Sequence, residues 1–321
     1  MASSSSSTST SNSNGSKSKY EAKLRYNVDR FAKILSDEPQ DSSLVQWLQE
    51  SYGVDKTNQL AQLSSLSPSS VQEQKTLLRD FLEWFRTQFP YYRDTCNHCG
   101  AKGCQFRGNH PPTLDEQTPS PNTTTTTATI IIDTTEVSYC PHCQQLTRFP
   151  RYLSAMEIVK RQRGRCSEYS LLLYRILVGV LGLPARWIVD WANHVWAEVW
   201  IHEKWVHLDP CEASVDQPLL YQGWGKKQTY IVAFQQRGPD PSSSSSVTNG
   251  NKKNDTAHCP SSVVDVTKDY TSDSWETIQE RRAQDGVTQE EIAAALDRAN
   301  ADLQQMTPSD IIATYSTSRT N

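Results

Sequence analysis

Residues 163–169 read RGRCSEY and are followed by a mostly apolar run that ends at Leu181. Gly182 and Pro184 stop this run, so the pattern predicts a buried helix whose first turn carries Cys166. The positive end of the helix dipole and the neighbouring arginines would favour the thiolate form of the cysteine, which is the form that attacks a carbonyl carbon. Because free cysteine is also a common core residue, this helix alone does not identify a nucleophile.

Two short strands are predicted downstream of this helix. In residues 194–201 (HVWAEVWI) and 205–209 (WVHLD), apolar residues occupy every second position, which is the period of a strand with one buried face. If both apolar faces enter one core and the chain reverses between the strands, Trp196 lies opposite Asp209, and His194 is its diagonal neighbour at roughly 7–8 Å. A slip of one residue would place His194 and Asp209 on opposite faces of the sheet.

This arrangement would bring together a nucleophile, a base and an orienting acid in the order Cys166, His194, Asp209. The imidazole would take the proton from the thiol, and the carboxylate would hold the ring tautomer and stabilise the imidazolium. A single histidine on a strand is more often structural, but its combination with a helix-start cysteine and an aspartate on the same face favours a catalytic triad. The residues themselves predict thiol-dependent acyl chemistry on an amide or an ester.

A second group of cysteines forms two C-x-x-C pairs, CNHC at residues 96–99 and CPHC at residues 140–143. Two thiolates separated by two residues can converge on one ion, and a second pair completes tetrahedral coordination. Redox chemistry is the competing interpretation, although a redox site needs only one pair. The Pro- and Thr-rich residues 111–127 are expected to form a loop insertion that lets the ends of a zinc ribbon meet. We therefore predict a structural Zn²⁺ site formed by Cys96, Cys99, Cys140 and Cys143.

Several motifs of the chain resemble the transglutaminase-like core of cytoplasmic peptide:N-glycanases. They occur in the family's order and are RFPRY (148–152), RCSEY (165–169), ARWIVD (185–190), HVWAEV (194–199), WVHLDPCE (205–212), QPLLY (217–221), GWGKK (223–227) and YIVAF (230–234). The resemblance covers about residues 76–300. It implies an α+β fold, with a transglutaminase-like (papain-like) core built from a helix-start cysteine and an antiparallel sheet, plus a zinc-ribbon subdomain.

The resemblance also implies an activity and a set of substrate-binding residues. The Cys166 thiolate would attack the side-chain amide of a glycosylated asparagine in a denatured N-glycoprotein, with the backbone N–H of the cysteine helping to bind the oxyanion. The glycan would leave as a glycosylamine, and the asparagine would become an aspartate. Trp84 matches a tryptophan ahead of the family's zinc site, although a core position is its simpler interpretation. The candidates for contacts with substrate are Arg186, Trp196, Glu198, Trp205, Glu212 and Trp84.

The sequence departs from the family pattern at three positions close to the triad. Ser167 and Tyr169 stand where the family usually has Gly and Trp, and Asn193 stands where it usually has Asp. Two other functions therefore stay open beside a peptide:N-glycanase. One is another transglutaminase-like acyl transferase or a cysteine peptidase, which would use the same triad but leave a crosslink or a cut backbone. The other is a catalytically weak adaptor that retains the fold.

Composition and charge restrict the class of protein further. The 321 residues, 36% of them hydrophobic, suffice for one core with tails. A net charge of −4 does not indicate nucleic-acid binding, and no run approaches the roughly 18 apolar residues of a membrane span. The N-terminus lacks the apolar region of a signal peptide, and the cysteine pattern suits a reducing compartment. We expect a cytoplasmic protein that can also be nuclear.

The patterns divide the chain into five segments. They are a disordered Ser-rich tail (1–19), N-terminal helices (20–95), a zinc ribbon with a Thr-rich insertion (96–147), the catalytic core with a disordered insertion at about 238–256 (148–270), and C-terminal helices with a tail (271–321). The second segment includes a Ser-rich linker (64–70) and a helix expected at residues 71–90. A capping box at residues 288–291 (TQEE) predicts the start of a C-terminal helix. The resemblance implies that such terminal helices can receive a ubiquitin-like proteasome shuttle protein.

Overall fold

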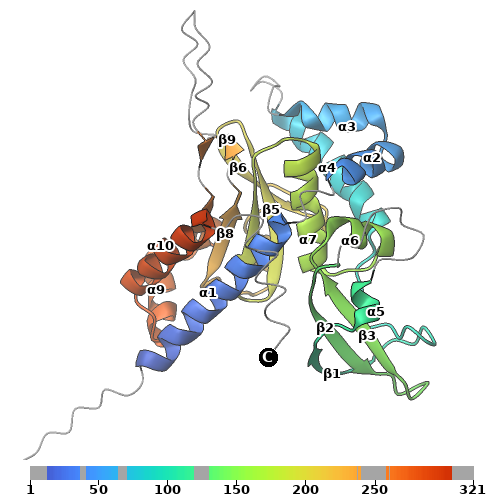
Figure 1. Cartoon of the computed structure of the whole chain (residues 1–321). Coiled ribbons are helices and arrows are strands. Elements are labelled where there is room, and N and C mark those ends of the chain that lie inside the picture. Colours follow the sequence, from blue (N-terminus) through green and yellow to red (C-terminus); the bar gives the residue numbers. More distant parts are fainter. Residues whose placement is uncertain are drawn as a thin grey trace, which may run out of the picture.

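A six-stranded antiparallel sheet forms the centre of the molecule (Figure 1). The computed structural model describes residues 13–36, 41–63, 71–118, 130–236, 238–239, 258–259 and 261–305. The strands follow the order β11-β8-β4-β5-β6-β7. Their bounds are β4 (Ala185–Asp190), β5 (His194–Ile201), β6 (Lys204–Asp209), β7 (Ser214–Val215), β8 (Ile231–Gln235) and β11 (Ser262–Asp265). An antiparallel sheet covered by helices is the predicted α+β class.

The predicted pairing of strands β5 and β6 is confirmed. Ala197 pairs with Leu208, so the next position along the ladder places Trp196 opposite Asp209. The two strands are joined by residues 202–203 alone, whose φ angles are 49° and 58°. A type I′ turn needs positive φ at both central positions, although neither residue here is the glycine or asparagine that adopts it readily. The register is therefore set by the buried faces of the strands and not by the turn.

Helices α7 (Cys166–Arg175) and α1 (Ser13–Leu35) pack on one face of the sheet. The ring of Phe31 on α1 stacks on Trp187 of β4 at 6.2 Å between centroids, and the indole N–H of Trp187 donates to the Ser170 hydroxyl on α7 (3.2 Å). A π-helical turn (Ile176–Val180) extends α7. The apolar residues of β5 that enter this main core are Val195, Ala197, Val199 and Ile201, as the alternation predicts.

The opposite face of the sheet is also covered, which the alternation did not predict. A second, smaller apolar cluster gathers there around Trp196. Helix α8 (Leu220–Gly223) and the 3₁₀ helix η5 (Thr267–Tyr270) close over it, with the Tyr221 ring 4.4 Å and the Tyr270 ring 4.7 Å from the ring of Trp196. The face expected to present side chains to substrate is therefore largely interior.

The N-terminal part of the chain forms helices within the described residues. Helix α1 begins at Ser13, inside the tail predicted to be disordered, while residues 1–12 lie outside the described residues. The helix predicted at 71–90 is α4 (Val71–Gln88), and the Ser-rich linker at 64–70 lies outside the described residues. Helices α2 (Asp41–Ser51) and α3 (Val54–Ala61) complete this group. Arg175 at the end of α7 pairs with Asp41 at the start of α2 (2.6 Å), which joins the group to the core.

A separate three-stranded sheet carries the two C-x-x-C loops. Its strands are β1 (Gln105–His110), β2 (Ile132–Tyr139) and β3 (Leu146–Tyr152), in that order. The predicted loop insertion at 111–127 holds a short helix, α5 (Leu114–Gln117), capped by Thr113, and residues 119–129 lie outside the described residues. Glu116 of α5 pairs with Arg148 of β3 (2.7 Å). Helix α6 (Ala155–Arg161) then leads to α7.

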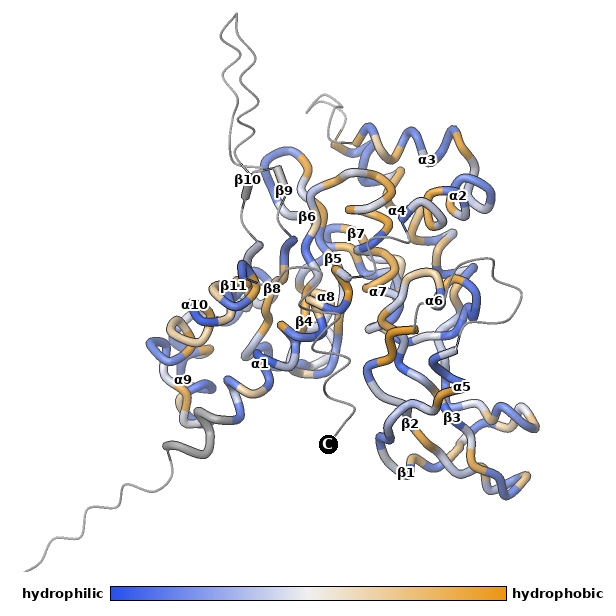
Figure 2. The backbone as a smooth tube through the Cα atoms, viewed as in Figure 1, coloured by the Kyte–Doolittle hydropathy of each residue, from blue (hydrophilic) through white to orange (hydrophobic). Residues whose placement is uncertain are grey.

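The C-terminal part packs beside α1 at the far edge of the large sheet (Figure 1). Strands β9 (Gly238–Pro239) and β10 (His258–Cys259) pair at the base of the predicted disordered insertion, most of which lies outside the described residues. Helices α9 (Trp275–Gln284) and α10 (Gln289–Gln305) follow. The predicted capping box forms, with the Thr288 hydroxyl accepting from the Glu291 N–H (3.3 Å). Along α10 hydrophobic and hydrophilic residues alternate (Figure 2), and one side of the helix is buried. Among the described helices, none has the length and apolar character needed to cross a bilayer.

Candidate active site and metal centre

Cys166 is the first residue of α7, as the sequence predicts. The Glu168 carboxylate accepts the backbone N–H of Arg165 (2.9 Å), which caps the helix from within its first turn. Gly164 permits close packing ahead of the helix, because a Cβ atom there would lie 2.8 Å from the ring of Tyr169. N–H groups in the first turn of a helix have no acceptor within the helix. The backbone N–H of Cys166 is therefore available to an oxyanion.

His194 lies between the thiol and the carboxylate. Its Nε2 is 2.7 Å from Oδ2 of Asp209, and the ring lies close enough to the Cys166 thiol for the two groups to interact electrostatically. Burial lowers the pKa of His194, but the hydrogen bond to Asp209 and the interaction with Cys166 outweigh burial and raise the pKa to about 9. At neutral pH the ring is therefore an imidazolium beside the thiol, the arrangement that activates a cysteine nucleophile.

The turn before β5 directs His194 toward the thiol. Asn193, the residue before it, has a φ of 67°, and its backbone N–H donates to the carbonyl of Asp190 (3.1 Å). Asparagine adopts this left-handed conformation more readily than most residues with a side chain. The departure from the family's aspartate at this position is therefore compatible with the turn.

Asp209 is fully buried with all its acceptor capacity in use. Oδ1 accepts the backbone N–H groups of Cys211 (2.8 Å) and Glu212 (3.3 Å), and Oδ2 accepts from His194 and from the Tyr221 hydroxyl (2.9 Å). Burial raises the pKa of Asp209, but the hydrogen bond and charge of His194 reverse this, so the pKa lies below its usual value. The carboxylate stays ionised although it has no contact with solvent.

The two arginines that flank Cys166 in the sequence have other partners than the thiol. The guanidinium of Arg165 pairs with Asp94 (2.7 Å) and Glu136 (3.0 Å) on the side of the small sheet. That of Arg163 lies 3.9 Å above the ring of Tyr92. The expectation that these arginines supply the positive charge for the thiolate is corrected: the charge of Arg165 is compensated by two carboxylates, and the group that interacts electrostatically with Cys166 is His194.

Four of the predicted substrate-binding residues form one network, in which all but the half-buried Trp205 are buried. The Arg186 guanidinium donates to the Glu198 carboxylate (2.6 Å) and lies 4.0 Å above the ring of Trp205. Glu198 also accepts from the Tyr270 hydroxyl (2.6 Å), which in turn accepts from the indole N–H of Trp196 (2.7 Å). Trp196 is 0% exposed, so the prediction that its ring stacks on substrate is wrong. Alternation of apolar and polar residues predicts which side chains of a strand share one face of the sheet. It does not predict whether another segment of the chain packs over that face.

The two other candidates lie in different surroundings. Glu212 is exposed, and its backbone N–H donates to Oδ1 of Asp209 (3.3 Å), so its side chain is close enough to the triad to contact a substrate. Trp84 packs in an aromatic cluster of the N-terminal helices, 4.6 Å from the ring of Tyr52 and 5.9 Å from that of Trp47. This packing favours the core interpretation of Trp84.

Two exposed aromatic residues next to the triad were missed by the sequence reasoning. The Trp224 ring is 47% exposed and meets the His194 ring edge to face at 5.5 Å. Tyr91 is 42% exposed, and its hydroxyl lies close to the Cys166 thiol: partial burial raises the pKa of the tyrosine, and the charge of the cysteine raises it further. The GWGKK motif could have pointed to Trp224. No sequence pattern around Tyr91 predicts its position near the triad. The residue is held there by a contact between distant segments, the backbone hydrogen bond from the N–H of Tyr92 to the carbonyl of Gly164 (2.8 Å).

Ser167 and Tyr169, the two residues of α7 that differ from the family pattern, both form side-chain hydrogen bonds. The Ser167 hydroxyl accepts from Arg30 of α1 (2.5 Å), a residue that also pairs with Asp133 (3.1 Å). The Tyr169 hydroxyl donates to the carbonyl of Pro90 (2.7 Å). Both side chains are buried, so each departure is accommodated by a partner from another segment and neither disturbs the contact between Cys166 and His194.

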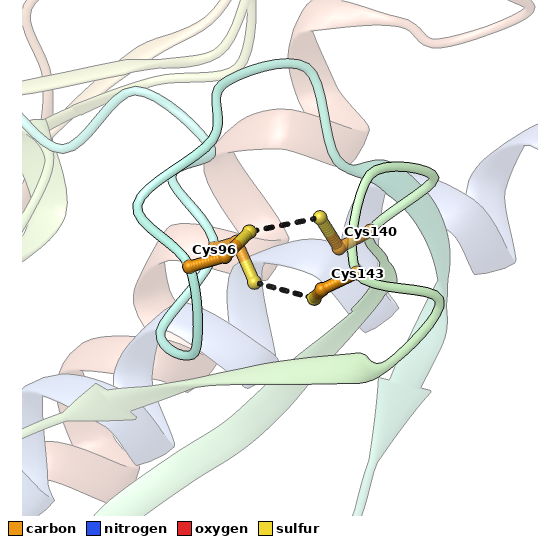
Figure 3. Close-up of side chains that lie close together, drawn as sticks. Cys96, Cys140 and Cys143 are labelled. Atoms are coloured by element: carbon orange, nitrogen blue, oxygen red, sulfur yellow. Dashed lines mark hydrogen bonds between the residues drawn. The ribbon is translucent and has the colours of Figure 1, made fainter.

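The four cysteines of the C-x-x-C loops meet at the end of the small sheet (Figure 3). Their sulfur atoms all lie within 4.8 Å of one another, and the pairs Cys96–Cys143 and Cys99–Cys140 are 3.6 Å apart. Four thiolates around one zinc ion at about 2.3 Å stand roughly 3.8 Å apart along each edge of the tetrahedron. The group can therefore hold a metal ion of that size.

The match with known proteins covers the region of the triad. Residues 113–210 match the transglutaminase-like superfamily. A peptide-N(4)-(N-acetyl-beta-glucosaminyl)asparagine amidase of Gallus gallus is 36% identical over 181 residues, 54% of this chain and 26% of that protein. The protein of the same name from Arabidopsis thaliana is 31% identical over 228 residues, 70% of this chain and 26% of that protein. The chain therefore carries a transglutaminase-like domain and is similar to peptide:N-glycanases.

The chain spans only part of those relatives, since the alignments cover 26% of the length of each. Among solved structures, a chain from the crystal structure of Rad4-Rad23 crosslinked to an undamaged DNA aligns over 97% of it, with a TM-score of 0.46 and 13% identity. A similarity at that level has no bearing on function.

Proposed function

We propose that the chain is a peptide:N-glycanase, a cysteine-dependent amidase that cleaves the bond between the glycan and the asparagine side chain of denatured N-glycoproteins. The observation that carries the proposal is the array in which His194 hydrogen-bonds the Asp209 carboxylate (2.7 Å) and interacts electrostatically with the Cys166 thiol. The family's curated amidases, similar over the same region, support the choice of bond.

The first half of the reaction forms a thioester. The Cys166 thiolate attacks the side-chain amide carbon, and backbone N–H groups at the start of α7 stabilise the charge on the carbonyl oxygen. The His194 imidazolium gives its proton to the amide nitrogen as the C–N bond breaks, which releases a glycosylamine. Asp209 keeps the imidazole ring oriented for this transfer and compensates its charge.

The second half restores the enzyme. The neutral imidazole of His194 removes a proton from water, and the resulting hydroxide attacks the thioester carbon. The C–S bond breaks, aspartate replaces asparagine in the peptide, and the thiolate–imidazolium pair forms again. The water oxygen enters the new carboxyl group, one proton of the water stays on His194, and the other leaves to solvent as the carboxyl group ionises to the carboxylate.

Substrate contacts are proposed at the open side of the triad. The exposed Trp224 ring beside His194 offers an apolar surface for a sugar. The exposed Glu212 carboxylate can accept sugar hydroxyl groups. The buried Arg186–Glu198 pair supports the site from below, because it holds Trp205 and Tyr270 in place.

We propose zinc as the metal of the four-cysteine centre, with a structural role. Four thiolates leave no open coordination position, which is the arrangement of structural zinc sites. When bound, the ion would fix the two loops that precede β1 and β3. Asp94 lies just before the first loop and Glu136 on the strand before the second, and both hold Arg165 next to Cys166.

The proposal also includes the cellular compartment of the protein and a protein partner. The described cysteines are free thiols, which supports a reducing compartment such as the cytoplasm or the nucleus. The side of α10 away from the core is exposed, and this surface could receive a ubiquitin-like proteasome shuttle protein.

The test is mass spectrometry of a denatured glycoprotein incubated with the zinc-loaded protein in oxygen-18 water. We expect the glycosylated asparagine to become an aspartate with one heavy oxygen and the glycan to be freed. Cys166→Ala should abolish both changes, while Cys104→Ser, a change at a thiol outside the triad, should not. An isopeptide crosslink or a cut backbone would favour another acyl transferase or a peptidase. An unaltered glycoprotein would favour the adaptor.

A further inference from the structure

Two buried polar side chains are linked to Asp209 by hydrogen bonds. They are His207 on β6 and Tyr221 on α8, which are 2% and 0% exposed. The Tyr221 hydroxyl is 2.9 Å from Oδ2 of Asp209, and Nε2 of His207 is 2.6 Å from the same hydroxyl. The triad mechanism uses neither residue. Buried polar groups of this kind are costly unless they are fully hydrogen-bonded.

The direction of each hydrogen bond follows from the backbone. The N–H of Gln217 points at Nδ1 of His207 (3.4 Å) and can only donate, so Nδ1 accepts and the ring proton of the neutral histidine is on Nε2. Nε2–H then donates to the Tyr221 oxygen. The hydroxyl proton of Tyr221 is left to donate to Asp209, whose ionised carboxylate can only accept. The chain of donors therefore runs in one direction, from Gln217 through His207 and Tyr221 to Asp209.

The hydrogen bond from Tyr221 is also one of the bonds that fix the position of the Asp209 carboxylate. Its Oδ1 is held by two backbone N–H groups, whereas Oδ2 is shared between His194 and Tyr221. The Tyr221 ring itself packs edge to face on the His194 ring at 4.9 Å. One side chain thus contacts both the base and the acid of the triad. Its hydroxyl restrains the carboxylate oxygen that orients His194.

We infer that His207 and Tyr221 are positioning residues of the active site, which act on the Cys166–His194 pair through a one-way hydrogen-bond relay to Asp209. The inference rests on the triad roles of the proposed function. By donating to Oδ2, Tyr221 withdraws charge from the carboxylate and limits how strongly Asp209 stabilises the imidazolium. His207 keeps the Tyr221 hydroxyl turned toward Asp209 by occupying the lone pairs of its oxygen.

The surroundings are consistent with a neutral His207. Burial lowers its pKa to about 4, while the charge of Asp209 opposes this and that of His194 adds to it. The ring therefore stays uncharged over the working pH range, and the direction of the relay does not change with pH. The titratable groups that face the relay from neighbouring elements are Asp209, His194, Cys211, Tyr270, Asp216 and Lys226.

The test measures the Cys166–His194 pair without a glycoprotein. Zinc-loaded protein is alkylated with iodoacetate at a series of pH values, and the rate at the Cys166 peptide is followed by mass spectrometry. Because iodoacetate is an anion, it reacts fastest while His194 is an imidazolium, so the basic limb of the profile reports that ring. Tyr221→Phe should move this limb upward by about half a pH unit, because a carboxylate with one donor fewer stabilises the imidazolium more.

A matched pair of variants at His207 separates the relay from packing. His207→Gln retains a donor for Tyr221 and an acceptor for Gln217 and should give the wild-type profile. His207→Leu retains only bulk and should shift the limb in the same direction as Tyr221→Phe, but less. For glycan release, Tyr221→Phe should lower kcat about tenfold with KM unchanged, which corresponds to the loss of one charge-assisted hydrogen bond.

Superimposable alkylation profiles for folded wild-type, Tyr221→Phe and His207→Leu proteins would overturn the relay. If Tyr221→Phe does not fold, the two His207 variants provide the test. Equal alkylation profiles for His207→Gln and His207→Leu would then also overturn the relay. A shifted limb in a protein that releases no glycan would support the relay while it contradicts the proposed function, so the two can fail separately.

Discussion

The two cysteine sites of this molecule are assembled over different lengths of chain. In the metal centre each pair of ligands comes from one short loop, and the small sheet has only to bring two loops together. The triad combines the start of a helix with the start of one strand and the end of the next. Local spacing therefore specifies most of the first site, whereas the second depends on strand register and on the packing of α7 against the sheet.

The two sites are not independent, because one chain of charged groups connects them. Arg165 reaches from Cys166 to Asp94 and Glu136 beside the metal loops, and Arg151 joins Glu136 (2.5 Å) to Glu168 of the catalytic helix (2.6 Å). Loss of the metal centre should therefore reach the triad indirectly, while damage to the triad should leave the metal centre intact. The following predictions test this asymmetry.

The largest effect is expected for Asp209→Asn. The side chain keeps its shape but loses the charge that stabilises the imidazolium, so kcat/KM for glycan release should fall about 10³- to 10⁴-fold. Bound zinc, measured by atomic absorption, should be unchanged. Asp265→Asn, at an aspartate paired with Arg282 instead (2.9 Å), should keep near wild-type activity. Activity of Asp209→Asn within tenfold of wild type would contradict the assigned role.

Cys140→Ser should have the next largest effect. Cys140 is fully buried, and loss of one thiolate should abolish zinc binding and lower the free energy of unfolding by several kcal/mol, on the order of 3–5. Activity should fall about tenfold, because Asp94 and Glu136 no longer hold Arg165 as firmly. Cys104→Ser, at a neighbouring thiol outside the four, is the control and should retain zinc. Full activity in a zinc-free Cys140→Ser protein would show that the two sites are uncoupled.

Alkaline pH should lower the activity of the triad while zinc stays bound at the metal centre. The imidazolium of His194, with a pKa raised to about 9, is needed to protonate the leaving nitrogen, so kcat/KM should fall about tenfold per pH unit above 9. Stability follows the same sign. The stabilisation from His194 is complete below the unfolded pKa near 6.5 and is lost as pH rises through 9. Activity and chemical denaturation measured from pH 6 to 10, with zinc content as the control, check both trends.

His207 should make the folded protein less stable at acid pH, whereas His194 makes it less stable at alkaline pH. Its pKa in the folded protein is lowered to about 4, so its contribution to stability is complete above about 6.5 and is lost as pH falls toward 4. Denaturation curves of His207→Gln should show a weaker decline than wild type over this range. An equal decline in both proteins would assign the acid sensitivity to other groups.

Trp224→Ala should affect substrate binding more than chemistry. Its exposed ring contacts His194 from the solvent side, so KM for a glycopeptide should rise about fivefold with a smaller change in kcat. Leu114→Ala removes an apolar side chain that is 77% exposed on the side of the small sheet and should change neither constant. A large fall in kcat with constant KM would instead make Trp224 a support for His194.

The smallest effects are expected at the family departures. Ser167→Gly loses the hydrogen bond from Arg30, and Tyr169→Phe loses the bond to the carbonyl of Pro90. Each should lower the free energy of unfolding by about 1 kcal/mol and change kcat less than twofold. Thermal denaturation and glycan release measure the two quantities. A strong gain in activity on Ser167→Gly would mean that this departure had weakened the enzyme.

The sequence by itself determined the elements that depend on local order. The helix start at Cys166, the alternation of β5 and β6, the two C-x-x-C loops and the capping box at Thr288 all follow from residues a few positions apart. The register of β5 against β6 could also be predicted, because a one-residue slip would have exposed an entire apolar face.

Only the tertiary structure decided what covers each surface. Trp196 is buried because Tyr270, more than seventy positions later in the chain, closes over it, and Arg165 turns from the thiol because Asp94 and Glu136 meet it from the small sheet. Tyr91 and Trp224 come close to the triad, and Tyr221 contacts Asp209, from segments whose periodicity does not predict these contacts. Periodicity records which face of an element is apolar, whereas contacts between distant segments arise only when those faces pack together.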